Sequence, residues 1–64
     1  MIVETTTAGL LPGDVTTASR QTIVRTDPVV NSTRHIAVTV DTKRGERVKR
    51  IWNARTRMRV ERNR

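Results

Sequence analysis

Arginines at alternate positions near the C-terminal end are the side chains best suited to a chemical task. Arg55, Arg57 and Arg59 follow one another at every second position, so on a β-strand their guanidinium groups would project from one face. Met58 and Val60 would then project from the opposite face. Because the planar guanidinium fork meets phosphate oxygens through paired hydrogen bonds, this spacing predicts a row of phosphate-binding side chains.

The segment around this row is strongly basic. Residues 43–64 contain ten lysines and arginines against two glutamates, whereas residues 1–42 contain three arginines against four acids. The electric field of such an uneven charge distribution favours a polyanionic or acidic partner. Alternatively, basic side chains on an outer face keep a small β-protein from pairing with other molecules through its strand edges. The residues predicted to contact a polyanion are Arg47, Lys49, Arg50, Arg55, Arg57, Arg59 and Arg62.

Other kinds of chemistry find little support. The chain has no cysteine, which excludes thiol catalysis, disulfides and thiolate metal ligands. His35 is the only histidine, and it has no convincing set of companion metal ligands. No serine or threonine has an identifiable partner base, and the glycines do not have the spacing of a phosphate loop. We therefore expect a protein that is not an enzyme and needs neither metal nor cofactor.

Three apolar residues are candidates for contact with a protein partner. Val29 and Val30 lie between loop-forming residues, where they would either close one end of the core or face a partner. Trp52 is the only aromatic residue, so it would serve as a core anchor or, alternatively, as a binding residue. A single ring does not make the stacking platform of a single-strand-binding protein.

Length and composition indicate one small domain. Sixty-four residues lie near the lower limit for unaided folding, and the core must come mainly from Val, Ile, Leu and Met. No stretch approaches the roughly 18 apolar residues that a membrane helix needs, and Met1–Thr7 lacks the features of a signal peptide. We expect a cytoplasmic protein without a membrane segment, and the sequence leaves its oligomeric state open.

Period-2 alternation and segments rich in threonine and β-branched residues predict strands in the first two thirds of the chain. Ile36, Val38 and Val40 share one face of the clearest strand, 34–41, which a hairpin loop at 42–45 follows. Two shorter strands are expected at 15–18 and 21–26, with Asp27-Pro28 ending the second because proline cannot donate to a ladder.

Residues 46–62 fit two patterns. As a helix, Val48, Ile51 and Trp52 share a stripe that Arg55 interrupts. As two strands, 46–52 and 56–62 are joined by a tight link, and we favour this second interpretation. The helical alternative would make the segment a basic arm that folds upon RNA.

This order of elements resembles the SH3-like small β-barrel. The opening Leu11–Val15 looks like the start of KOW- and Tudor-type members, and a short 3₁₀ turn over 52–55 would separate the last two strands. The resemblance implies an all-β, five-stranded barrel over 10–62, preceded by a flexible arm or short edge strand at 1–9 and followed by a tail at 63–64. The aromatic rows of peptide- and methyl-lysine-binding members are missing.

Two functions follow as hypotheses. The first is a small basic protein that binds DNA or RNA by contacting phosphates, largely without sequence preference. The second is a protein-interaction module or regulator that docks on an acidic surface of a larger host protein. Compact, basic, cysteine-free chains of this kind look like those found among short phage or mobile-element products.

Overall fold

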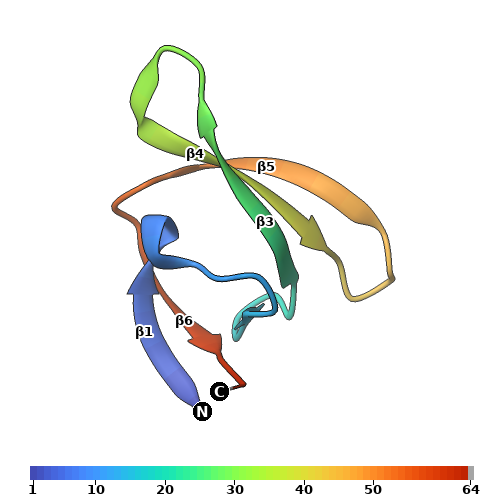
Figure 1. Cartoon of the computed structure of the whole chain (residues 1–64). Coiled ribbons are helices and arrows are strands. Elements are labelled where there is room, and N and C mark those ends of the chain that lie inside the picture. The colour runs from blue at the N-terminus through green and yellow to red at the C-terminus, as the bar shows by residue number, and fades with distance from the viewer. Residues whose placement is uncertain (64) are drawn as a thin grey trace.

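The computed structural model describes residues 1–63 and is all-β, as the sequence predicts (Figure 1). Its strands are β1 (Ile2–Thr6), β2 (Val15–Thr16), β3 (Thr22–Val29), β4 (Ser32–Asp41), β5 (Arg47–Asn53) and β6 (Arg57–Glu61). Arg64, in the predicted tail 63–64, lies outside the described residues. Residues 46–62 thus form two strands, and the alternative of a basic helix is wrong.

The strands form one antiparallel sheet in the order β1-β6-β2-β3-β4-β5. Two expectations are corrected here, because the sheet has six strands instead of five and does not close into a barrel. The additional strand is β1, which pairs with β6 from Ile2 opposite Glu61 to Thr6 opposite Arg57. Within the described residues, β1 and β5 are therefore the two edges of the sheet.

The 3₁₀ turn also lies elsewhere than expected. It is η1 (Thr7–Gly9), which directly follows β1, whereas β5 and β6 are joined by a two-residue turn at Ala54 and Arg55. In that turn the Thr56 N–H donates to the Asn53 carbonyl at 3.2 Å. The Ala8 N–H donates to the Ala54 carbonyl at 3.2 Å, which ties η1 to the turn.

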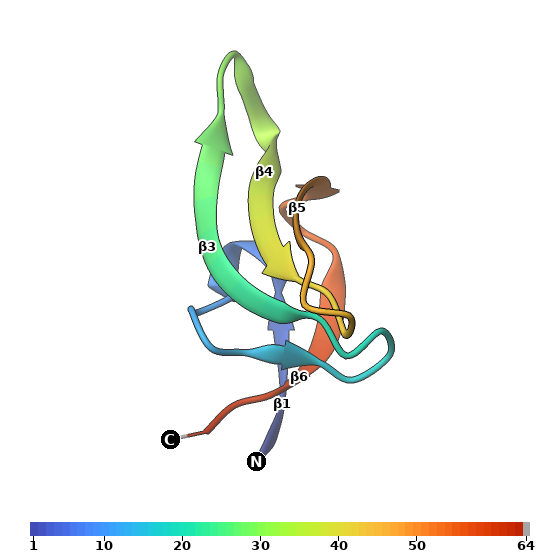
Figure 2. The ribbon, with the colours of Figure 1, turned by 90° about the vertical axis from the view of Figure 1, so that its right-hand side faces the viewer.

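The β3–β4 hairpin is longer than predicted, because β3 continues through Pro28 to Val29. One edge of β3 pairs with β4, and the opposite edge pairs with β2 only at Thr22. That opposite edge has no partner strand near Pro28, so the N–H group that proline lacks is not needed there. The hairpin turns at Asn31, whose positive φ of 63° suits asparagine. Figures 1 and 2 both show its tip projecting beyond the rest of the sheet.

The core lies on the face predicted for the clearest strand. Val38 and Val40 are fully buried, and Ile36 packs against them with partial exposure. The rest of the buried cluster comes from Leu10, Ile23 and Val60. Val3, Val48, Trp52 and Met58 pack against this cluster. Strand β6 thus contributes one face to the core and leaves the other for solvent.

Candidate polyanion-binding surface

The outer face of β6 holds two arginines of the predicted row. Arg57 and Arg59 are exposed and alternate with Met58, which packs on the core, and Val60, which is fully buried. This alternation is the one that the sequence indicates. Arg55 is exposed as well, but it lies in the turn that precedes the strand.

Acids compensate much of the charge on this face. Arg57 Nη1 lies 3.4 Å from Glu4 Oε1, and Arg59 lies directly opposite Glu4 in the register of β1 and β6. At the other end of β6, Glu61 Oε2 lies 3.4 Å from Arg20 Nη1. These exposed pairs contribute little to stability. They do reduce the net positive charge that the face presents to a polyanion.

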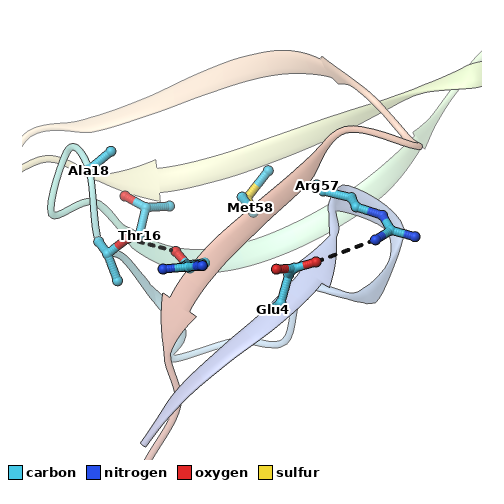
Figure 3. Close-up of a pocket in the computed structure, with 7 residues that line it drawn as sticks. Glu4, Thr16, Ala18, Arg57 and Met58 are labelled. Carbon is cyan, nitrogen blue, oxygen red and sulfur yellow. Dashed lines mark hydrogen bonds and ion pairs between the residues drawn. The ribbon is translucent and has the colours of Figure 1, made fainter.

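A groove of about 450 Å³ lies beside β6 and is lined by residues from both faces of this strand. The lining residues are Glu4, Thr16, Thr17, Ala18, Arg57, Met58 and Arg59 (Figure 3). Thr17 closes one side, since its N–H and Oγ1 both donate to the Arg59 carbonyl, at 3.1 and 3.2 Å. The groove presents both signs of charge around the side chain of Met58, so it shows no clear preference for an anion.

Strand β5 does not lie beside β6, so Arg47 and Lys49 are not next to Arg57 and Arg59. β5 pairs with β4 alone, whereas β6 inserts between β1 and β2. The reason is the tight turn after Asn53, from which β6 leaves in a different direction (Figure 1). The basic residues are therefore divided between two regions of the sheet.

The basic residues of β5 differ in their surroundings. Arg47 donates two hydrogen bonds to the Asp41 carboxylate, Nε to Oδ1 at 2.9 Å and Nη2 to Oδ2 at 3.2 Å. These bonds raise the pKa of Arg47 and lower the pKa of Asp41. Lys49 shares that outer face, whereas Arg50 lies on the face of Val48 and Trp52 and is itself exposed.

Exposed cations without an ion pair concentrate along β5 and at its two ends. Arg34 lies near one end of β5, although it belongs to β4. Its carbonyl accepts the Ala54 N–H at 2.7 Å, which holds the beginning of β4 beside the β5–β6 turn. Outside the group, Arg59 is the one other exposed lysine or arginine without an ion pair among residues 1–63. We call the group the basic rim, and its members are Arg34, Lys43, Arg44, Lys49, Arg50 and Arg55.

Three of these residues were missed by the sequence analysis. Lys43 and Arg44 were placed in the hairpin loop without being given a binding role, although their basic character was visible. Arg34 precedes the basic segment by nine positions in the sequence, and only the topology brings it to the end of β5.

The guanidinium of Arg62 is hydrogen-bonded within the protein and is not free to bind a partner. Its Nε and Nη2 donate to Asp14 Oδ1 and Oδ2 at 3.0 and 2.7 Å, and Nη2 also donates to the Gly9 carbonyl at 3.2 Å. Hydrogen bonding to Asp14, which is 2% exposed, raises the pKa of Arg62. The guanidinium is already occupied, so we do not include Arg62 in the basic rim.

The three candidate partner-contact residues lie in different places. Val30 is 84% exposed at the projecting tip of the β3–β4 hairpin, and Val29 is half-buried beside it. Trp52 packs against the core with partial exposure. Of the three, Val30 alone is exposed to a partner.

Polar clusters suited to catalysis or metal binding are sparse in the described part of the chain. Ser32 Oγ lies 3.0 Å from His35 Nδ1, but both side chains lie at the surface, and no carboxylate among residues 1–63 pairs with the ring. Residues 1–63 contain no group of three or more His, Asp or Glu side chains placed to hold a metal ion. Over the same residues, no helix is long and apolar enough to cross a membrane.

Comparison of the chain with family models, with curated proteins and with solved structures finds no significant match. The resemblance to SH3-like barrels therefore stays a prediction.

Proposed function

We propose that this chain is a non-enzymatic nucleic-acid-binding protein whose basic rim contacts backbone phosphates. The single observation behind the proposal is the distribution of ion-paired and unpaired cations. Six exposed basic side chains without an ion pair follow β5 and its ends, whereas the β6 face intersperses its arginines with Glu4 and Glu61. The phosphate-binding surface is thus centred on β5 instead of on the arginine row of β6.

The dimensions of β5 suit this role. Seven residues in an extended strand span about 20 Å, which corresponds to about six nucleotide steps along one strand of a duplex. Lysine and arginine side chains reach from such an edge without a deep pocket. Contacts of this kind position a protein on a nucleic acid and are largely independent of base sequence.

Base recognition is not part of the proposal. Trp52 is the only aromatic residue, and it packs against the buried cluster. The ring is therefore engaged in the core instead of forming an open surface on which bases stack in succession. We expect similar affinity for unrelated sequences of equal length and strandedness.

Binding of fluorescently labelled ligands at two salt concentrations tests the proposal. A duplex without terminal phosphates, a single strand and an RNA hairpin would be titrated with the full chain. We expect the logarithm of the affinity for the duplex to fall with the logarithm of salt concentration at a slope between about −3 and −5. Absence of binding at low salt, or binding insensitive to salt, contradicts the proposal.

One observation supports a second candidate, an interaction module for a larger protein with an acidic surface. The β3–β4 hairpin projects from the sheet and presents Val30 at its tip (Figure 2). An exposed apolar side chain on a projecting hairpin is suited to insertion into a partner's pocket, with the basic rim accelerating the encounter.

Capture experiments with and without nuclease separate the two candidates. The variant Val29→Ser/Val30→Ser would be compared with Lys49→Ala/Arg50→Ala. Loss of a nuclease-resistant partner only in the valine variant supports the interaction module. Loss of all captured material upon nuclease treatment supports nucleic-acid binding.

A further inference from the structure

A hollow of about 410 Å³ lies where the beginning of β4 meets the β5–β6 turn. It is formed by two segments far apart in the sequence, which the hydrogen bond from the Ala54 N–H to the Arg34 carbonyl holds together at 2.7 Å. The residues that line it are Thr33, Arg34, Asn53, Ala54 and Arg55. We call it the turn cleft.

The polar side chains of the turn cleft are suited to donating hydrogen bonds. Arg34 and Arg55 both line it, and neither guanidinium has an ion pair or a hydrogen bond within residues 1–63. Asn53 Oδ1 already accepts the Arg55 N–H at 2.9 Å, which leaves the amide nitrogen of Asn53 to donate elsewhere. Thr33 adds a hydroxyl group, and none of the lining residues is acidic.

The two other hollows described for this chain differ in one respect. Both the groove on β6 and a smaller hollow beside it include Glu4, which pairs with Arg57. The turn cleft instead brings two cations to one concave place without a compensating acid among its lining residues. An anion bound in the cleft would therefore meet two cations and no competing carboxylate.

The backbone around the turn cleft is well fixed. The turn is closed by the Thr56 N–H to the Asn53 carbonyl at 3.2 Å, and the Thr7 N–H donates to the Thr56 carbonyl at 3.0 Å. On the other side, Ser32 Oγ accepts the Arg34 N–H at 3.4 Å. A ligand would therefore meet a largely preformed cleft and would have to order mainly the arginine side chains.

We propose that the turn cleft is a binding site for a terminal phosphoryl group, meaning a phosphate monoester. Two guanidinium groups suit the doubly charged, three-oxygen end of a monoester better than the single charge of an internal phosphodiester. The volume exceeds that of a phosphate ion and leaves room for the sugar or other organic group that bears it. The monoester is either the phosphorylated end of a nucleic-acid strand or a phosphorylated small molecule.

Arg34 and Arg55 also belong to the basic rim, but this inference does not require binding along the rest of the rim. Contact with internal phosphates is measured with a duplex that has no terminal phosphate, whereas the turn cleft is tested with the phosphoryl group as the only variable. Failure of one measurement therefore leaves the other interpretable.

The test compares ligands that differ by one phosphoryl group. Amide spectra of the ¹⁵N-labelled full chain would be recorded with adenosine 5′-monophosphate and, as the matched control, with adenosine. We expect shifts at Arg34, Ala54 and Arg55 with the monophosphate only. Shifts that are equal with adenosine, that are absent at millimolar monophosphate, or that centre on β6 overturn the proposal.

A second pair of ligands identifies the source of the phosphoryl group. A short single strand with a 5′-phosphate would be compared with the same strand bearing a 5′-hydroxyl group. A gain of about tenfold in affinity on 5′-phosphorylation assigns the site to strand ends. Equal affinity of the two strands, together with monophosphate shifts at the cleft, assigns it to a small molecule.

Variants localise the effect. Arg34→Ala/Arg55→Ala should abolish the monophosphate shifts, whereas Arg57→Ala/Arg59→Ala, which removes the same charge, should retain them. All four side chains are exposed, so we expect both variants to fold. Equal loss in both variants contradicts the assignment. Should the first variant fail to fold, the comparison of monophosphate with adenosine on the unmodified chain still decides the question.

Discussion

The Arg62 guanidinium and the Asp14 carboxylate meet side by side, with Nε and Nη2 of the arginine 3.0 and 2.7 Å from the two carboxylate oxygens. This bidentate pair joins the end of the sheet to the loop before β2. The Leu11 N–H donates to the same carboxylate at 2.9 Å. Asp14 thus holds its own turn and the C-terminal segment in place at once.

Replacing Asp14 should therefore be costly. Asp14→Ala leaves the Leu11 N–H without its acceptor and Arg62 without its anion, and we expect a loss of about 2–4 kcal/mol in the free energy of unfolding. Urea unfolding followed by the fluorescence of Trp52 measures this loss.

The matched control for Asp14 is Glu4→Gln, which disrupts an exposed ion pair with Arg57. We expect this substitution to change stability little. A similar midpoint of unfolding for the two variants would contradict the structural role of Asp14.

Acid should weaken the fold through Asp27 and Asp41. Hydrogen bonds from Arg25 and Arg47 lower the pKa of these carboxyl groups below the ordinary value of 3.8. A lowered pKa in the folded state means that folding favours the charged carboxylate. The contribution of each carboxylate to the free energy of unfolding is therefore fully present above pH 3.8 and disappears as the pH falls through the folded-state pKa. Both carboxyl groups are partly exposed to solvent, which screens these interactions, so we expect a modest effect.

The measurement for these aspartates is urea unfolding of the wild type and of Asp27→Asn/Asp41→Asn at pH 7 and pH 2. The wild type should be more stable at pH 7, and the difference between the two proteins should shrink at pH 2. A difference that stays constant over this range would show that the two carboxylates do not contribute in the expected way.

Replacing Gly45 by a residue with a side chain should destabilise the fold because of the backbone conformation at this position, and not because of a steric clash. Its φ is +86°, and a Cβ atom built there would meet nothing within 4 Å. We expect Gly45→Ala to cost about 1–2 kcal/mol because L-residues avoid this region. Gly45→Asn should cost less, since asparagine enters the left-handed region more readily. Equal stability of all three proteins in thermal unfolding would contradict this explanation.

The parts of the fold that follow from local pattern were predictable. The alternation of Ile36, Val38 and Val40 placed the core face of β4 correctly, and Gly45 indicated the turn after it. Pro28 misled, because proline ends a strand only where its missing N–H is needed, and the far edge of β3 is unpaired there. Whether an edge is paired is a property of the whole sheet and not of a local segment.

The candidate surface was less predictable for the same reason. The exposure of Arg57 and Arg59 follows from spacing, but the ion pair of Arg57 with Glu4 requires the pairing of β1 with β6, more than fifty residues apart. Arg62 has the parity of Met58 and Val60, so alternation alone does not place it on the outer face, and its partner Asp14 lies 48 positions away in the sequence. Contacts between residues far apart in the sequence decide which cations have an ion pair, and local patterns in a single sequence do not reveal such contacts.

The central claim is that polyanions bind along β5 and not on β6, and one pair of variants tests it most directly. Lys49→Ala/Arg50→Ala and Arg57→Ala/Arg59→Ala each remove two positive charges from a net charge of +7. Affinity for a duplex without terminal phosphates would be measured for both over a series of salt concentrations. We predict that the β5 variant loses about two units of the salt-dependence slope, and that the β6 variant loses less than half as much. An equal or larger loss in the β6 variant would contradict the account.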